Sequence, residues 1–176
     1  MGVRGTSDDS EWEATYRFAD DQIDRATHRF ILMRQWTRSL KAGVEVNPGA
    51  DEIGVVANWR LLDETARRPA LILGTSSDRI GTPAGQSYYA TLSKSLHRET
   101  GIPIAPYVGI SWSGAEDRFV VPFGASLAVG THVSAMLQND GVHTHGAVTF
   151  GIGDRWAITL LAIRLEEPGI TVGTRF

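Results

Sequence analysis

Apolar and polar residues alternate with a period of two along almost the whole chain, in segments of about ten residues separated by turn-forming residues. Side chains on a β-strand point alternately to opposite faces, so each segment predicts a strand with one apolar face. In the last segment, Ile170, Val172 and Phe176 fall on one face. Gly173 and Arg175 fall on the other face. The pattern predicts an all-β protein whose final strand reaches the last residue.

About twelve strands follow one another with short connections, an arrangement typical of an up-and-down antiparallel β-barrel or a large sandwich. Asn139-Asp140-Gly141 is a hairpin signal, and we expect the longest loop at residues 77–85. Residues 63–67 and 92–98 are expected either as connections or as short helical turns. The expected strands lie within residues 12–18, 28–36, 39–47, 53–61, 70–76, 87–93, 106–113, 119–127, 132–138, 145–152, 156–165 and 170–176.

The composition fits one folded domain. The chain has 176 residues, and we expect a flexible N-terminal segment at residues 1–10 and a single barrel domain at residues 11–176. It holds 17 basic and 20 acidic residues, so no electrostatic footprint for nucleic acid is present. The absence of cysteine excludes disulfides, cysteine–zinc sites and thiol catalysis.

The composition of the two strand faces favours a barrel with its apolar side toward a membrane. The polar face is rich in Gly, Ser, Thr, Asn and Tyr with single charges, which suits an enclosed, crowded interior. Large aromatic residues lie near strand ends, where they would form girdles at the two bilayer interfaces. The candidates for lining the lumen are Glu13, Arg17, Lys41, Glu45, Asn58, Arg60, Tyr89, Tyr107, His143, His145 and Arg175. The candidates for the lipid interfaces are Trp12, Phe18, Trp59, Trp112, Phe119 and Phe176.

These features make the chain resemble Gram-negative outer-membrane β-barrel proteins. The terminal strand at residues 169–176 ends in an aromatic residue, as is typical of the class, although Thr174 stands where a larger apolar residue is common. Residues 69–76 and 87–94 also resemble segments of uncharacterised small porin-like proteins of this kind.

The resemblance implies a monomeric transmembrane barrel in the bacterial outer membrane, in contact with its lipid. It also implies that the outer-membrane assembly machinery recognises the C-terminal strand through Phe176. An even number of strands would place both termini on the periplasmic side and the loop at residues 77–85 on the extracellular side. Residues 1–10 contain no apolar segment of a signal peptide, so we expect either a processed outer-membrane form or a cytosolic protein.

Two functions remain open for such a barrel. The inward charges can line a passive narrow pore for small polar solutes, or they can pair into a plug that makes the barrel a structural protein. We expect no catalytic residue, metal or cofactor in either case.

Three alternatives use the same residues differently. A soluble β-barrel would bury the apolar face and bind an apolar ligand inside. A lipid-modifying enzyme on a barrel would use Ser126 or Ser134 with His132 or His145, but no Gly-x-Ser-x-Gly elbow is present. His143 and His145 can present two imidazoles to a metal, but the sequence fixes no acidic partner for them.

Overall fold

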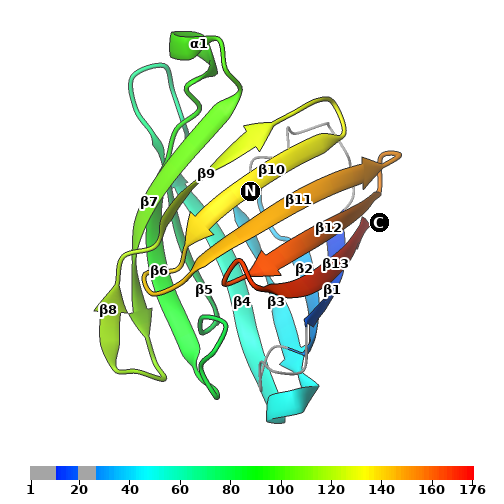
Figure 1. Cartoon of the computed structure of the whole chain (residues 1–176). Coiled ribbons are helices and arrows are strands. Elements are labelled where there is room, and N and C mark those ends of the chain that lie inside the picture. Colours follow the sequence, from blue (N-terminus) through cyan, green and yellow to red (C-terminus); the bar gives the residue numbers. More distant parts are fainter. Residues whose placement is uncertain (1–10, 20–26) are drawn as a thin grey trace.

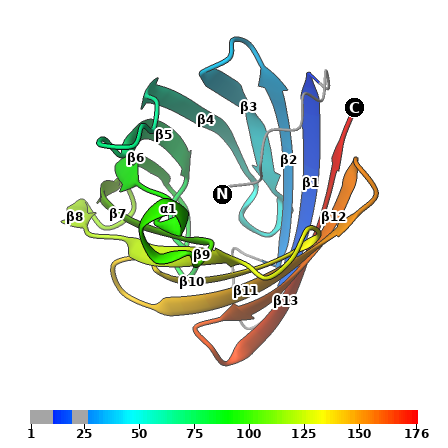
Figure 2. The ribbon, with the colours of Figure 1, turned by 90° about the horizontal axis from the view of Figure 1, so that it is seen from above.

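The computed structural model describes residues 11–19 and 27–176, and these residues form a closed β-barrel (Figures 1 and 2). The expected flexible segment at residues 1–10 lies outside the described residues. The strands are β1 (Trp12–Ala19), β2 (His28–Gln35), β3 (Leu40–Asn47), β4 (Glu52–Leu62), β5 (Ala70–Ser77), β6 (Gln86–Ser93), β7 (Ile104–Ser113), β8 (Arg118–Val120), β9 (Phe123–Ala128), β10 (Val133–Asn139), β11 (Thr144–Ile152), β12 (Trp156–Ile163) and β13 (Glu167–Arg175).

The strands form one antiparallel sheet in which sequence neighbours are also spatial neighbours. β1 pairs with β13, and β6 pairs with β7, so the sheet closes on itself. The short β8 pairs with the end of β7 and β9 pairs with its beginning, so β8 and β9 occupy one position of a 12-stranded barrel. The prediction of an up-and-down barrel with about twelve strands is confirmed.

The expected strand at residues 119–127 is interrupted. Val121 and Pro122 separate β8 from β9, because proline has no backbone N–H for the ladder. The Pro122 carbonyl still accepts a hydrogen bond from Gly109 N at 2.8 Å, so the barrel wall stays continuous there.

The connections differ from expectation in two places. The β6–β7 connection at residues 94–103 contains the short helix α1 (His97–Thr100) and is longer than the β5–β6 connection at residues 78–85. The prediction that the latter is the longest loop is therefore wrong. Residues 63–67 form no helix, whereas a 3-10 turn, η1 (Pro48–Ala50), links β3 to β4. The Asn139-Asp140-Gly141 signal does mark the β10–β11 turn.

The C-terminal residue takes part in closing the barrel. Phe176 N donates to Trp12 O at 3.1 Å, and Trp12 N donates to Phe176 O at 3.0 Å. Both chain ends of the described barrel therefore lie at one end, which we call the terminal end. The β5–β6 connection lies at the opposite end, which we call the distal end; α1 marks the terminal end at the top of Figure 1 and β8 the distal end at its bottom.

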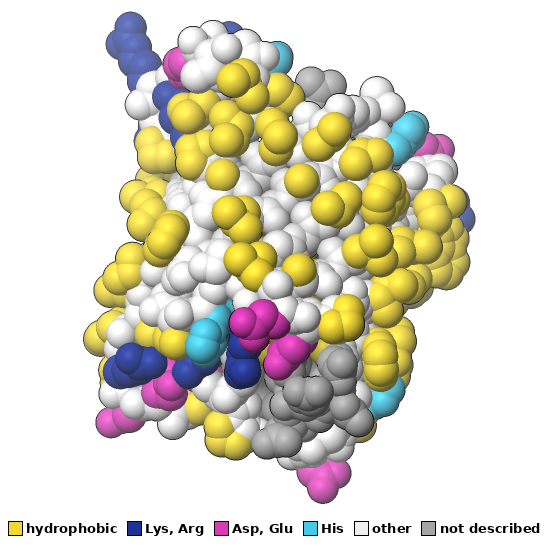
Figure 3. All heavy atoms as spheres, in the orientation of Figure 1, with side chains coloured by type: hydrophobic (Ala, Val, Ile, Leu, Met, Phe, Trp, Pro, Cys, Tyr) yellow, Lys and Arg dark blue, Asp and Glu magenta, His cyan; other side chains and the backbone are white. Residues whose placement is uncertain are grey.

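The apolar side chains face outward. Large exposed hydrophobic residues occur on nearly every strand, among them Val55 on β4, Ile110 on β7 and Leu160 on β12. In Figure 3 hydrophobic side chains cover the middle of the visible wall, and charged side chains gather toward its lower rim. The soluble alternative with a buried apolar face is not the arrangement observed. Among the described residues, no helix has the length and apolar character needed to cross a bilayer.

Candidate pore lining and mouth loop

Polar side chains on the inner wall reach across intervening strands, which shows that they point into the barrel. Lys41 Nζ on β3 lies 2.7 Å from Glu13 Oε2 on β1, although β2 runs between these strands. Arg175 Nε on β13 approaches the same carboxylate oxygen at 3.6 Å. Glu13 is thus held between two cations on the inner wall of the half near the terminal end. Arg17 lies on the same inward face of β1 as Glu13, because the two residues are separated by an even number of positions along the strand.

A second charged group lies deeper in the distal half. The Arg29 guanidinium on β2 forms an ion pair with Glu45 on β3, and Arg29 Nη2 also donates to Ser76 Oγ on β5 at 2.7 Å. The Glu45 side chain is 0 % exposed, and its second oxygen accepts a hydrogen bond from Ser77 N. A fully buried carboxylate is tolerable only when it is paired in this way. This group ties three strands of the inner wall together.

Two tyrosines bridge strands on the inner wall. Tyr89 Oη on β6 donates to Asn58 Oδ1 on β4 at 2.7 Å, across β5. The Tyr89 ring lies directly over Gly74, where a Cβ atom would collide with it. Tyr107 Oη on β7 donates to Gln138 Oε1 on β10 at 3.2 Å, across β9. The hydroxyl groups of both tyrosines are therefore hydrogen-bonded on the inner wall.

The connection between β5 and β6, residues 78–85, folds across the distal end, and we call it the mouth loop. Ile80 packs against Ala19 at the end of β1 and Ile163 at the end of β12. In the strand order β12 lies on the side of the barrel opposite β5 and β6. The mouth loop therefore spans the distal opening from one wall to the other.

Polar contacts anchor the base of the mouth loop to the β7–β8 turn. The Asp78 carboxylate accepts hydrogen bonds from Ser113 Oγ at 2.6 Å and from Ala115 N at 3.0 Å. Arg79 forms a bidentate ion pair with Glu116, its Nε donating at 3.0 Å. Arg118 Nη2 adds a contact of 3.1 Å to Glu116. Asp78 is buried and needs these donors, so the anchor fixes where the loop leaves the wall.

The electrostatics of this anchor stabilise its charged form. The hydrogen bond from Arg79, followed by that from Arg118, holds the pKa of Glu116 below its usual value in spite of some burial. The Glu116 hydrogen bond in turn raises the pKa of Arg79, opposed by burial. Both groups stay ionised at neutral pH, so the ion pair at the distal mouth is intact there.

His145 is held on both sides of its ring. Its Nε2 lies 3.1 Å from Asp140 Oδ2, and its Nδ1 accepts a hydrogen bond from Arg164 N at 3.2 Å. Burial raises the pKa of Asp140, but hydrogen bonds from His145 and from the backbone N–H groups of His143 and Val142 outweigh this effect and leave it lowered. Neither ring nitrogen of His145 is left to activate a serine hydroxyl.

Two candidates for the lumen lie at the two ends of the barrel. His143 is in the β10–β11 turn and not on a strand, where its backbone N donates to Asp140 Oδ1 at 2.8 Å. Arg60 pairs in register with Ile72, just before the pairing irregularity near the end of β4, contacts Asp63 at 2.7 Å and donates to Arg38 O at 3.0 Å. Both partners of Arg60 are in turns at the terminal end, so its side chain belongs to the rim. No group of three or more His, Cys, Asp or Glu residues suited to a metal occurs in residues 11–19 and 27–176.

The six aromatic candidates form two groups on the outer wall, one toward each end of the barrel. Trp12, Trp59 and Phe176 lie toward the terminal end. Phe18, Trp112 and Phe119 lie toward the distal end, where the Trp112 and Phe119 rings meet edge to face at 4.9 Å. Five of the six are largely exposed and Trp112 is half-buried.

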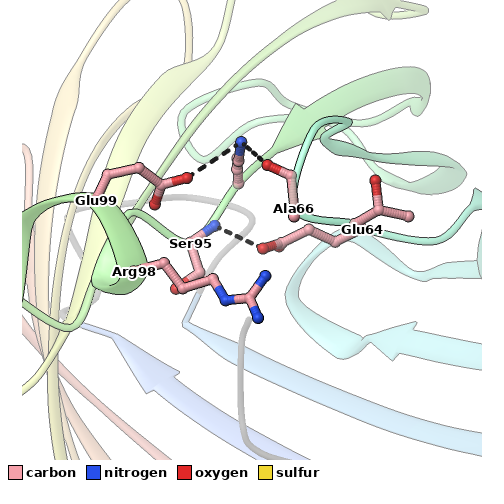
Figure 4. A pocket seen from close by; sticks show the side chains of 7 residues that line it. Glu64, Ala66, Ser95, Arg98 and Glu99 are labelled. Carbon is pink, nitrogen blue, oxygen red and sulfur yellow. Dashed lines mark hydrogen bonds and ion pairs between the residues drawn. The ribbon is translucent and has the colours of Figure 1, made fainter.

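An open polar groove of about 320 Å³ lies on the terminal rim, between the β4–β5 turn and α1. Ser95 N donates to Glu64 at 3.2 Å, and Lys94 Nζ donates to Ala66 O at 2.8 Å across it (Figure 4). Arg98 and Glu99 from α1 complete the lining. These contacts join the two longest described connections of the terminal end rather than enclosing a deep site.

Several residues of this arrangement were missed in the sequence. Arg29 is recognisable in retrospect, because Phe30 and Leu32 set the outward parity of β2 and leave Arg29 inward. Glu116 and Asp140 lie in turns and carry no periodic signal, so only the folded structure brings them to Arg79 and His145.

The closed wall, the apolar outer face and the polar inner face define a porin-like, outer-membrane-type β-barrel. The fold is similar to that of the NanC porin, solved in a rhombohedral crystal form, with a TM-score of 0.55 and 10% sequence identity. The match covers 94% of this chain and 98% of that chain. No family model and no curated protein sequence matches the chain. The likeness is one of fold, and it agrees with the strand count and closure described above.

Proposed function

We propose that the protein is a monomeric, passive channel for small polar solutes in the bacterial outer membrane. The observation that carries this proposal is the opposite polarity of the two faces of one closed wall. Outward Val55, Ile110 and Leu160 need an apolar solvent, whereas inward Glu13, Lys41 and Glu45 form a charged interior. A bilayer outside and water inside satisfy both faces.

The lumen is the proposed path, with the residues of the inner wall as its lining. Glu13, Lys41 and Arg175 supply charges of both signs near the terminal end, and Tyr89 and Tyr107 supply hydroxyl groups further along. Such a lining can replace part of the hydration shell of a polar solute. In the proposed orientation the terminal end faces the periplasm, and the mouth loop faces outward.

The mouth loop supports a second candidate function, a sealed structural barrel. The mouth loop crosses the distal opening to pack Ile80 against Ala19 and Ile163, and Asp78 and Arg79 hold the loop base. If this arrangement is permanent, no solute passes. We propose that the loop instead narrows the path and opens by leaving the contact with Ala19 and Ile163.

The proposal includes no enzymatic activity. The barrel enzymes considered above require a histidine nitrogen free to accept a proton from serine. Both His145 nitrogens are engaged by Asp140 and by Arg164 N, which favours a structural role for this residue.

The proposed partners are outer-membrane lipid and the assembly machinery that recognises the closing strand. Phe176 is 55% exposed on the outer wall while its backbone is paired with Trp12, so the ring remains accessible at the terminal end.

A flux assay tests the proposed function. The purified protein is reconstituted in vesicles, and entry of small sugars and amino acids is followed by vesicle swelling. Uptake that falls with solute size supports a narrow pore, and vesicles with heat-denatured protein provide the baseline. Protein that stays monodisperse in water without detergent contradicts the membrane location. Protein that inserts, shown by a heat-modifiable gel shift, but gives no flux supports the sealed structural barrel.

A further inference from the structure

An arginine lies on the outer wall between two tryptophans at the terminal end. The Arg34 guanidinium carbon is 5.6 Å from the Trp12 ring centroid and 5.0 Å from the Trp36 ring centroid. Arg34 pairs in register with Trp12 on β1 and with Ala42 on β3, which are outward residues. The cation is therefore outside the barrel and takes no part in lining the lumen.

The position of this cluster suits a membrane interface. An outward arginine at the middle of a bilayer is costly, whereas the cost almost disappears near the interface. Arg34 is the second-last residue of β2, and the exposed Trp36 follows directly after the strand. Four of the five tryptophans, namely Trp12, Trp36, Trp59 and Trp156, are at this end of the barrel. The cluster thus occupies the most strongly marked interface of the wall.

The hydrogen-bonding capacity of Arg34 is only partly used. Its Nη2 donates to Glu11 Oε2 at 2.9 Å, and among the described residues Glu11 is the acceptor that it meets. The side chains of Arg34 and Glu11 are 38% and 61% exposed. A guanidinium has five N–H donors and favours phosphate oxygens, and stacking on indole rings leaves its edge available. The Arg34 cation and the Glu11 anion therefore lie side by side and face the surroundings of the outer wall at the terminal end.

We propose that Trp12, Arg34, Trp36 and Glu11 bind the headgroup of a zwitterionic glycerophospholipid that carries a phosphate and an ammonium group, as in phosphatidylethanolamine. Arg34 donates to the phosphate, and Glu11 accepts from the ammonium. The two indole rings contact the glycerol region and hold the guanidinium in place. The charge pair matches the phosphate and ammonium of one headgroup, whereas a purely anionic headgroup would meet the Glu11 carboxylate. This inference rests on the proposed membrane location, and it adds a lipid site on the outer wall to the proposed channel.

The test uses the full chain in dodecyl maltoside, titrated with phosphatidylethanolamine that has brominated acyl chains. All proteins carry Trp59, Trp112 and Trp156 replaced by Phe, so that quenching of tryptophan fluorescence reports binding near Trp12 and Trp36. Arg34→Gln is expected to weaken the apparent affinity by about fivefold, the contribution of one arginine close to a lipid surface. Glu11→Gln is expected to shift the preference from phosphatidylethanolamine toward brominated phosphatidylglycerol, because it removes the anion that repels an anionic headgroup. Arg98→Gln, an exposed arginine on the rim, is the matched control and is expected to leave the affinity unchanged.

Other results would contradict either the lipid site or the membrane location on which it rests. Equal affinity of Arg34→Gln and the unsubstituted protein, with a normal heat-modifiable gel shift for both, contradicts the lipid site. Competition by millimolar inorganic phosphate alone also contradicts it, because the site then binds free phosphate. A protein that needs no detergent contradicts the membrane location itself, which separates failure of the proposed function from failure of the lipid site.

Discussion

The two ends of the barrel are built on the same strands but are finished differently. At the distal end the mouth loop crosses the opening, and Asp78, Arg79 and Ile80 attach it to the wall. At the terminal end the connections join one another along the rim, through Glu64 and Lys94, and tryptophans crowd the outer wall. In the proposed channel, this difference assigns control of passage to the distal end and positioning in the membrane to the terminal end.

The inner wall shows the same contrast. Glu45 in the distal half is fully buried and bound by Arg29 and Ser77 N, whereas Glu13 near the terminal end is only half-buried between Lys41 and Arg175. A buried charge depends on its partner for stability, whereas a partly exposed ion pair contributes little to it. The charged groups of the inner wall therefore differ in what they contribute to stability along the length of the barrel.

The largest effect is expected from removing the mouth loop. Asp78 N donates to Gly85 O at 2.8 Å, so replacing residues 79–84 by Asn-Gly leaves a two-residue hairpin in register. This variant is expected to carry a steady current in a planar bilayer, well above that of the unsubstituted protein. Ile80→Ala should give a smaller increase, because it removes only the packing against Ala19 and Ile163.

The control for this experiment is Ile102→Ala, which truncates an exposed apolar residue in the β6–β7 connection at the terminal end. It should leave the current unchanged. If shortening the mouth loop changes nothing, the distal end does not restrict the path, and the contrast between the two ends loses its functional meaning.

The next largest effect concerns stability. Glu45→Gln is expected to lower the free energy of unfolding by about 3–5 kcal/mol, because it leaves the Arg29 guanidinium buried without its anion. Glu13→Gln, the partner experiment near the terminal end, should cost about 1 kcal/mol or less. Denaturant unfolding in detergent, followed by tryptophan fluorescence, measures both. Equal losses of unfolding free energy for the two variants would show that Glu45 and Glu13 contribute equally to stability, and would contradict the contrast between the two halves.

How much of this was predictable from sequence differs between the wall and the mouth. The period-two alternation predicted the strands, and the small, polar composition of the other face favoured an outward apolar face, since a bilayer outside and water inside require opposite polarities on the two sides of a strand. The positions of the aromatic residues near strand ends follow from the same strand pattern, and their role at the lipid interfaces stays a prediction. The contacts of Arg79 with Glu116 and of Ile80 with Ile163 join residues far apart in the chain, and turn residues carry no period. Arg60 keeps the inward parity of β4, but its contacts with Asp63 and with Arg38 O hold the side chain at the terminal rim, and the alternation cannot predict contacts with turn residues.

A smaller effect is expected from pH, and it should be confined to the distal end. The pKa of Glu116 is lowered by Arg79, so the ion pair stabilises the loop base above the usual carboxyl pKa and loses this contribution as the pH falls through the lowered value. The current should be constant from pH 7 to about pH 5 and rise below about pH 4. Glu116→Gln should raise the current at pH 7 and flatten this profile. A current that falls on acidification would contradict the role of the anchor.

The smallest effect is expected from the solvated charges near the terminal end. Glu13→Gln leaves Lys41 and Arg175 without their shared anion, so the pore should become more selective for anions. The reversal potential under a salt gradient measures this shift, and it should decrease at high ionic strength as screening increases. An unchanged reversal potential would place Glu13 outside the conducting path.

In the proposed membrane location, the apolar face of each strand meets lipid while the polar face meets water. Because the chain contains no cysteine, single cysteines can be placed in turn at residues 170–173 of β13 in reconstituted vesicles. We expect cysteines at Thr171 and Gly173 to react with a small, charged, water-soluble thiol reagent added from the terminal side, and cysteines at Ile170 and Val172 not to react. Uniform reactivity at all four positions, or the opposite alternation, would contradict it.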